Sequence, residues 1–387
     1  MKTMSKCISI LAAAVLITAC GSDDSGSGDK GTSPGTAPAT APGTAPGTAP
    51  ATAPETAPGT APATTSAGGA SSDAVSSDLI IGVMSSVSGA EVVDRWANSV
   101  TSALDQIGIK TVVSNGEGDP AVMNQVLSSY ITQKVDAIVI AAPLYTGPIS
   151  QALKDAKDAG IPVFAVGGSR VEDPDGLLMQ YAVSPSELGN ALGEYLVDKY
   201  PSGTQWVHLD LPAIAAAHEP IVAGKKVLDA AGWELVGNSD LDAADFFEKT
   251  GPAVVDLLRG NPDAKVLFSC CDYVPGVAVP ALQRAGFEKV LIAAEFDNLT
   301  TLDLIRDGKP VITVATNTDI SIAVAIDQLL IVLGGGKADP TADEGLYKYT
   351  VLDSTNLPAK GEYAYPPQDT LAPYVEKWLA EYPGLEG

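Results

Sequence analysis

The fold is decided by a stretch that begins with Asp136-Ala137-Ile138-Val139-Ile140 and ends with Ile161-Pro162-Val163-Phe164-Ala165-Val166. Both runs are almost continuously apolar, as strands buried on both faces of a sheet are. Between them, Gly147-Pro148 opens a predicted helix, because proline favours the first helical position, and Gly160 ends it. A strand, a helix and a second strand in this order predict a parallel sheet with a right-handed crossover.

The same alternation continues outward on both sides of this stretch. It starts at the apolar run Leu79-Ile80-Ile81-Gly82-Val83-Met84 and begins a second time near Glu187. Two successive α/β halves within residues 78–387 predict two similar lobes, each a parallel sheet flanked by helices. Ligands bind beyond the carboxyl ends of the strands in such sheets, so two facing lobes would enclose a ligand between them. We predict strands at 79–84, 111–113, 136–140, 161–166, 206–209, 235–236, 265–269, 290–293 and 311–314, and helices at 90–106, 121–133, 147–160, 187–199, 220–231, 251–259 and 274–285.

The composition excludes several classes of protein. The 387 residues include 23 basic and 47 acidic side chains, and the net charge of −24 argues against a nucleic-acid partner. A hydrophobic content of 45% excludes global disorder. The chain has two histidines, four cysteines and no Cys-x-x-Cys spacing, and no nucleophile–base pair is visible. We therefore predict no metal, no cofactor and no enzymatic activity.

The N-terminus has the features of an export signal. Lys2 and Lys6 form a positive region, and the apolar residues 8–18 are too few to span a bilayer. The sequence Ile17-Thr18-Ala19-Cys20-Gly21 resembles a bacterial lipobox, in which the cysteine is lipidated and becomes the first mature residue. By this resemblance residues 1–19 are a signal peptide, and two acyl chains on Cys20 anchor the protein to the extracytoplasmic face of the cell membrane. The alternative is an ordinary secretory signal with an incidental cysteine.

Residues 20–77 continue from the predicted lipidation site as a low-complexity linker rich in Pro, Thr, Ala and Gly. They lack the large apolar side chains that a core needs. Polyproline-type stiffness extends a chain by about 3.1 Å per residue, so the segment predicts a spacer between the membrane and the globular part. Its prolines recur at every fourth position, at Pro34, Pro38, Pro42, Pro46, Pro50, Pro54, Pro58 and Pro62.

Several segments of the globular part form a series: residues 124–131 with 135–140, residues 152–163, the segment from Asp272 to Gly286 that contains a predicted helix, and the pair Phe296-Asp297. Together they resemble type I periplasmic sugar-binding proteins of ABC transporters. The resemblance covers about residues 78–357 in the family's order. It implies two lobes that close around a ligand by a hinge motion, with the closed form presented to an ABC permease in the membrane. The DNA-binding repressors that share this fold have a helix-turn-helix where this chain has the lipobox and linker.

The resemblance also implies where the lobes begin and end. Three crossovers would join them, at 182–184, 316–318 and 349–352. Lobe 1 would comprise residues 78–183 and 316–345, and lobe 2 residues 184–315 and 346–357, which leaves 358–387 as a C-terminal extension. We predict a monomer that binds a small molecule for an ABC importer. The alternative is a surface sensor of the same fold that passes its closed form to a signalling partner.

The predicted ligand site departs from the sugar-binding pattern. Val92 and Val93 stand where sugar binders place stacking aromatics, and the Asp of the family's Asp-Arg pair is missing before Arg170. The family's Asn falls at Cys271. Because lost polar groups cannot satisfy a ring of hydroxyls, we predict a ligand with fewer hydroxyls than a common aldose. The alternative is that shifts of loop register hide the polar contacts. The residues predicted to line the site are Ser85, Ser86, Val87, Val92, Pro143, Leu144, Tyr145, Gly168, Ser169, Arg170, Ala213, His218, Cys271, Asp272, Tyr273, Asp297, Thr316 and Asn317.

Three other features allow two interpretations each. Cys270 and Cys271 form either a vicinal disulfide or two free thiols, since neighbouring Cα atoms lie about 3.8 Å apart, below the usual disulfide range. Asp272 is either a helix N-cap or a ligand contact. Trp96, at helical spacing with Val92, is expected in the core more than in the pocket. Residues 211–217 read as an apolar loop before a helix that begins at Pro220.

Overall fold

The computed structural model describes residues 74–387 except 144–145, 169, 171–175 and 243–244. The predicted signal peptide, the lipidation site at Cys20 and the linker up to residue 73 lie outside the described residues. None of the described helices is both long enough and apolar enough to cross a bilayer. The elements are β1 (Ile80–Ser85), α1 (Glu91–Asp105), β2 (Lys110–Asn115), α2 (Pro120–Gln133), β3 (Ala137–Ala141), α3 (Thr146–Asp158), β4 (Val163–Val166), β5 (Met179–Tyr181), α4 (Pro185–Lys199), β6 (Gln205–Asp210), α5 (Ala215–Ala230), β7 (Glu234–Asp240), α6 (Phe246–Gly260), β8 (Val266–Ser269), α7 (Val274–Ala285), β9 (Leu291–Glu295), α8 (Leu299–Arg306), β10 (Val311–Thr316), α9 (Asp319–Leu333), β11 (Tyr349–Leu352) and α10 (Pro367–Glu381).

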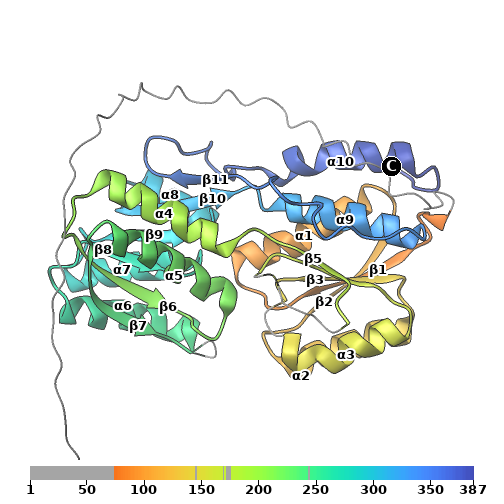
Figure 1. Ribbon diagram of the computed structural model, residues 1–387, viewed down its shortest axis with the longest axis horizontal. Coiled ribbons are helices and arrows are strands. Elements are labelled where there is room, and N and C mark those ends of the chain that lie inside the picture. The colour runs from red at the N-terminus through yellow and green to blue at the C-terminus, as the bar shows by residue number, and fades with distance from the viewer. Residues whose placement is uncertain (1–73, 144–145, 169, 171–175, 243–244) are drawn as a thin grey trace, which may run out of the picture. The chain divides into compact units, whose positions relative to one another are not determined.

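The first lobe is built on a parallel sheet in the order β2-β1-β3-β4-β5. Helices α1 and α9 cover one face, with α10 packed against α9, and α2 and α3 cover the other (Figure 1). Strands β1 and β3 are buried almost throughout, which is why their sequences are continuously apolar. The predicted alternation of strand and helix therefore builds a sheet covered on both faces.

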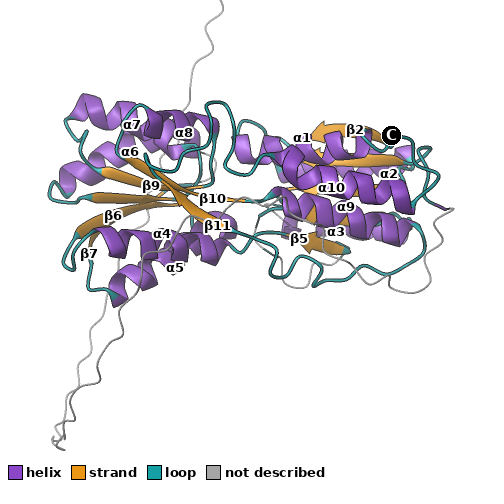
Figure 2. Ribbon diagram, turned by 90° about the horizontal axis from the view of Figure 1, so that it is seen from above, coloured by secondary structure: helices purple, strands orange, loops and turns teal. Residues whose placement is uncertain are grey.

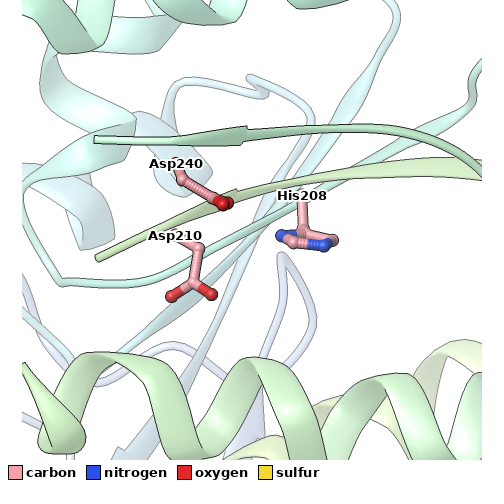
Figure 3. Close-up of side chains that lie close together, drawn as sticks. All are labelled: His208, Asp210 and Asp240. Carbon is pink, nitrogen blue, oxygen red and sulfur yellow. The ribbon is translucent and has the colours of Figure 1, made fainter. Parts of the chain in front are cut away.

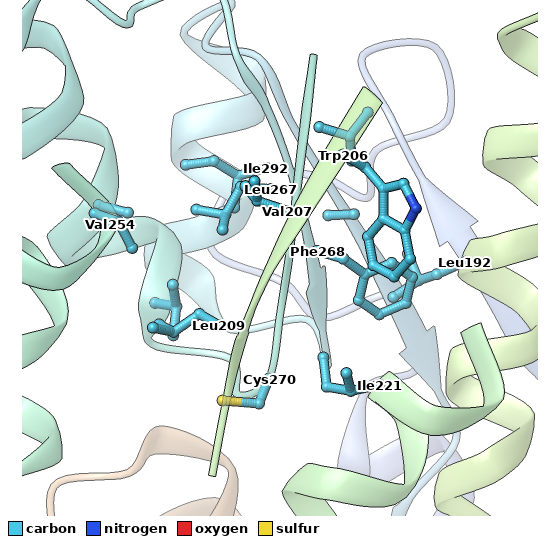
Figure 4. Packing of buried hydrophobic residues seen from close by; sticks show 14 of the residues in the cluster. Leu192, Trp206, Val207, Leu209, Ile221, Val254, Leu267, Phe268, Cys270 and Ile292 are labelled. Atoms are coloured by element: carbon cyan, nitrogen blue, oxygen red, sulfur yellow. The ribbon is translucent and has the colours of Figure 1, made fainter. Parts of the chain in front are cut away.

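The second lobe is built on a sheet in the order β11-β10-β9-β8-β6-β7, in which β11 alone runs antiparallel. Figure 2 shows α4 and α5 on one face of this sheet and α6, α7 and α8 on the other. Trp206 and Phe268 are fully buried and lie with Leu192 and Ile221 between the sheet and α4 and α5 (Figure 4). The two lobes confirm the predicted α/β fold class.

Four connections join the lobes. Residues 182–184 link β5 to α4, and 317–318 link β10 to α9, close to two of the predicted crossovers. The third crossover was predicted near 349–352. Those residues form strand β11, paired with β10, and the chain crosses directly before it, over 334–348. A fourth crossing, 353–366, leads from β11 to α10.

The C-terminal helix α10 belongs to the core of the first lobe. Leu371 and Trp378 are buried together with residues of α1 and α9. Trp378 also donates a hydrogen bond of 2.9 Å from Nε1 to Asp327. Beyond the helix, Gly384 forms a β-bridge with Ser76. Residues 358–387, predicted as a C-terminal extension, thus contribute apolar contacts to the core of the first lobe.

Two helices begin five residues earlier than predicted. Helix α5 begins at Ala215 because the Ile214 carbonyl accepts hydrogen bonds from the N–H groups of Ala217 and His218, so Pro220 lies inside the helix. Residues 215–217 are therefore helix and not loop. Helix α6 likewise begins at Phe246, with its proline inside. Proline is favoured at the first helical position, but it can also lie farther inside a helix. In α5 and α6 tertiary packing outweighed the preference of proline for the helix start.

Candidate ligand-binding site

A cavity of about 500 Å³ lies at the carboxyl ends of the strands of both sheets. This volume lies within the range typical of small-molecule sites, about 300–1,000 Å³. The first lobe contributes residues that follow β1, β2, β3 and β4, and the second lobe contributes residues at the ends of β6, β7, β8 and β9. The lining residues are Val87, Ala90, Val92, Val93, Trp96, Glu117, Gly118, Ala142 and Gly168 from the first lobe, Val183, Pro185 and Leu188 from the connection and α4, and Leu211, Ile214, Ala216, Ala217, Asp242, Phe246, Phe247, Cys271, Asp272, Tyr273, Glu295 and Phe296 from the second.

Aromatic rings from both lobes line this cavity. Trp96 and Phe296 meet edge to face with ring centroids 5.9 Å apart. Tyr273 packs against Phe246 at 5.0 Å and against Phe247 at 4.7 Å. Phe247 is 51% exposed, so a large apolar surface remains available to a ligand. Such rings offer flat apolar faces that bury 150–250 Å² each when covered completely.

Every charged side chain among the described lining residues is a carboxyl group. Glu295 is 1% exposed, and its Oε1 has no hydrogen-bond partner among the described residues. Burial raises the pKa of Glu295 well above its usual range. Burial also raises the pKa of Asp272 to about 6, although a hydrogen bond from Asn298 opposes the shift. Glu117 and Asp242 are exposed.

Four non-glycine lining residues have a left-handed backbone. Glu117 has φ of 56°, Ala142 of 55°, Cys271 of 69° and Phe296 of 58°. Each follows the end of a strand directly or within two residues, at β2, β3, β8 and β9. Residues with side chains pay a conformational cost for positive φ, and such costs cluster at functional sites. The positive φ angles are thus found at the strand edge that lines the cavity.

Comparison with known proteins agrees with this geometry. A family model described as the periplasmic binding protein domain matches residues 81–337. The chain belongs to this family. Within that family, the ribose import binding protein of Salmonella typhimurium is 25% identical over 271 residues, which cover 69% of this chain and 88% of the relative.

Solved structures of periplasmic binding proteins share the fold. A galactofuranose binding protein aligns with a TM-score of 0.63 and 19% identity, over 78% of this chain and 99% of that one. An ABC transporter solute binding protein from Mycobacterium smegmatis with bound glycerol aligns with a TM-score of 0.63 and 20% identity, over 72% of this chain and 95% of that one. These similarities show the fold, and the match to the family model confirms the family predicted from the sequence.

The structure of this binding protein brings together one part of the predicted site. The lining residues found by sequence reasoning are Val87, Val92, Gly168, Cys271, Asp272 and Tyr273. Leu144, Tyr145 and Ser169 lie outside the described residues. The predicted residues that lie outside the cavity lining are Ser85, Ser86, Pro143, Arg170, Ala213, His218, Asp297, Thr316 and Asn317.

Several residues outside the lining hold the connections between the lobes. Arg170 pairs with the fully buried Asp343 and lines a different cavity. Asp297 accepts a hydrogen bond of 2.8 Å from the Ala364 N–H. Asn317 bonds residues 346 and 348 of the third crossing.

The remaining predicted residues are held by their own lobe or lie at its surface. The Ser85 hydroxyl donates to the Val87 carbonyl, and Pro143 is buried. Ser86 and Thr316 are buried, whereas Ala213 is exposed. His218 is a helix residue whose Nδ1 lies 2.7 Å from Asp210 Oδ2.

The structure bears on the three features that allowed two interpretations each. Cys270 and Cys271 carry free thiols in the structure, and the alternative of a vicinal disulfide remains a prediction to be tested. Asp272 does not cap α7, since the residue at the N-cap is Tyr273. Trp96 is 3% exposed in the core and also lines the cavity, where its Nε1 donates to Thr318 at 2.6 Å.

Sequence reasoning missed most of the carboxyl and aromatic lining. Glu295 and Phe296 were missed because β9 extends to Glu295, two residues beyond its predicted end, and Phe296 follows directly. Phe246 and Phe247 were missed because α6 begins five residues before its predicted start. The signal that was available is the apolar–acidic run at 293–297, Ala-Ala-Glu-Phe-Asp, in which a glutamate ends a buried strand.

Proposed function

We propose that this protein is a lipid-anchored solute-binding receptor on the extracytoplasmic face of the membrane. It captures a small molecule between its two lobes and, as a monomer, delivers it to the permease of an ABC importer. Membership of the periplasmic binding protein family supports this function, as does the similarity to a ribose import binding protein. The observation that carries the proposal is the cavity at the facing strand ends, since a ligand there contacts both lobes. The anchor rests on the lipobox resemblance around Cys20.

The lining defines the class of ligand. Among its described residues there is no Arg, Lys, Asn or Gln, the side chains that donate hydrogen bonds to sugar oxygens. A hydroxyl oxygen buried without a donor costs about 1–3 kcal/mol, so a ring of such oxygens is disfavoured. The ligand therefore has apolar faces for the aromatic rings and a few donors for the carboxyl groups of Asp272 and Glu295. Deoxy or modified sugars, small alcohols and aromatic compounds fit this description.

A thermal-shift panel of the purified protein tests this ligand class. The panel contains common aldoses, deoxy sugars, polyols, small alcohols and aromatic alcohols. A ligand at 100 times its Kd adds about 2.7 kcal/mol to the free energy of unfolding, which raises the midpoint measurably. We expect shifts confined to the less hydroxylated compounds. A clear shift with an ordinary aldose alone would refute the ligand class while leaving the receptor function intact.

A variant assigns the binding to the cavity. Glu295→Gln replaces the buried carboxyl group with an amide of similar size, and it should abolish or greatly reduce the ligand-induced shift. Asp263→Asn is the matched control, because it removes one charge from an exposed turn away from the cavity. Equal loss in both variants would mean that the ligand does not bind at Glu295.

The competing function is that of a surface sensor with the same fold. Measurement of ligand uptake distinguishes the sensor from the importer receptor. A strain that lacks this gene should lose uptake of the labelled ligand if the protein serves an importer. Unchanged uptake together with a lost transcriptional response to the ligand would instead support a sensor. Adjacent genes for a permease and an ATPase would favour the importer, and an adjacent kinase gene the sensor.

A further inference from the structure

The edge of the second sheet gathers three possible metal ligands. His208 and Asp210 lie two residues apart on β6, so their side chains point to the same face. Asp240 on β7 is the register partner of Asp210. One ligand atom of each residue lies within 4.8 Å of the others, and Figure 3 shows the three side chains close together on the two neighbouring strands.

His208 supplies an independent indication of a ligand. It is only 8% exposed, and its Nδ1 has no hydrogen-bond partner among the described residues. A buried imidazole nitrogen without a partner is costly, because it has lost its contact with water. One ring nitrogen is on the side that faces the two carboxylates (Figure 3). The neighbouring ring of Trp206, 5.8 Å away, packs against the imidazole.

The two carboxylates differ in how they are held. Asp210 is 3% exposed, and it accepts a hydrogen bond of 2.7 Å from the Leu211 N–H on Oδ1. Its Oδ2 lies 2.7 Å from Nδ1 of His218, on α5. Asp240 is exposed and gives the cluster an opening to solvent. Hydrogen-bonding partners thus orient Asp210, and the exposure of Asp240 leaves a path from solvent to the cluster.

We propose that His208, Asp210 and Asp240 bind a divalent transition metal ion such as Zn²⁺. An imidazole nitrogen with carboxylate oxygens is a ligand set that Zn²⁺ accepts, and two carboxylates balance its charge. His218 is a positioning residue, since it fixes the Asp210 carboxylate as outer partners of metal ligands do. Water completes the coordination on the open side at Asp240.

This proposal goes beyond solute capture and revises the sequence-based prediction of no metal. The sequence offered no motif because the ligands come together through the register of two parallel strands, 30 residues apart in the chain. The metal would also fix the carboxyl ends of β6 and β7, which lead into the ligand cavity. Leu211 follows Asp210 directly and Asp242 lies two residues after Asp240, and both line that cavity. An empty site would leave these ends less constrained.

Calorimetric titration of the purified, chelator-treated protein with Zn²⁺ tests the site. We expect one equivalent to bind and an excess of Ca²⁺, which prefers oxygen ligands, not to displace it. Asp240→Asn should weaken Zn²⁺ binding about tenfold or more. Glu234→Gln is the matched control, since it removes the same charge from an exposed position at the other end of β7. Its affinity should remain that of the parent protein.

Nuclear magnetic resonance of the imidazole rings identifies the bound atom. With two histidines in the chain, each ring can be assigned separately. Zn²⁺ should shift the ¹⁵N resonance of a nitrogen of His208. The proposal is overturned by any of three results: no Zn²⁺ binding, equal weakening in both variants, which would indicate diffuse attraction to an acidic surface, or an unchanged His208 spectrum at saturation.

Discussion

Replacing Asp272 with asparagine should stabilise the protein at pH 8 and have little effect near pH 4. Asp272 is 3% exposed, and burial raises its pKa from 3.8 to about 6. The folded state therefore binds a proton more tightly than the unfolded chain does. The stability associated with this group is present below pH 4 and is lost as the pH rises through 6.

The magnitude follows from the size of the shift. A difference of about two pKa units corresponds to about 3 kcal/mol, and linkage assigns about 2 kcal/mol of it to the interval from pH 4 to pH 8. Asparagine carries no charge at any pH and keeps the shape of the side chain. It can also still face the Asn298 amide, which lies 3.4 Å from Asp272 Oδ2. The advantage of the variant should therefore grow with pH.

Urea unfolding at pH 4, 5, 6, 7 and 8 measures the free energy of unfolding of both proteins. Asp263→Asn, in an exposed turn, controls for the removal of one negative charge from a chain of net charge −24. Its difference from the parent protein should vary little over this range. If Asp272→Asn is as destabilising at pH 8 as at pH 4, the ionised carboxyl group is well solvated or well paired, and the reasoning about buried cavity carboxylates is refuted.

Two further predictions concern packing and thiol chemistry. Gly189→Ala should destabilise the protein by about 1–3 kcal/mol in the same unfolding assay, because the added Cβ would lie 2.0 Å from the Pro220 carbonyl oxygen on α5. Gly260→Ala is the control and should be neutral, because no atom lies within 4 Å of its added Cβ. Alkylation of the denatured, non-reduced mature protein should modify both Cys270 and Cys271, which mass spectrometry would show. If neither cysteine is modified, the two form a disulfide.

The fold could be predicted largely from local patterns. Runs such as Ala137–Ala141 are apolar throughout because the strand is buried on both faces, and buried strands of this kind leave a direct signal in the sequence. Helix starts were less predictable, because the Ile214 carbonyl begins α5 with no side-chain cap to reveal it. The fourth connection, 353–366, was not predicted, because it follows from the packing of α10 against α9, which lies some 50 residues earlier in the chain.

The candidate site could be predicted only where it follows from strand ends. Val87 and Cys271 were found because residues after parallel strands converge at one edge. Arg170 was assigned to the same edge, but its guanidinium pairs with the buried carboxylate of Asp343, which lies 173 residues away in the chain. Glu295 was missed because β9 ends two residues beyond the predicted strand end. Long-range pairing and the exact ends of strands are therefore the features that residue types alone do not reveal.

The contacts that cross between the lobes bear on how a ligand enters. Glu91, on α1 of the first lobe, accepts hydrogen bonds of 2.9 Å from the Leu299 N–H of the second lobe and 2.8 Å from the Tyr363 hydroxyl of the fourth connection. Tyr363 also lies under the guanidinium of Arg95, 4.1 Å from its ring centroid. On the proposed function the lobes must separate to exchange ligand. Separation breaks the hydrogen bond that the Leu299 N–H donates to Glu91, whereas the contacts of the Tyr363 side chain with Glu91 and Arg95 are both to α1 of the first lobe. Tyr363 is therefore placed to keep the Glu91 carboxylate partnered during opening, which lowers the cost of the motion relative to leaving that carboxylate with no partner.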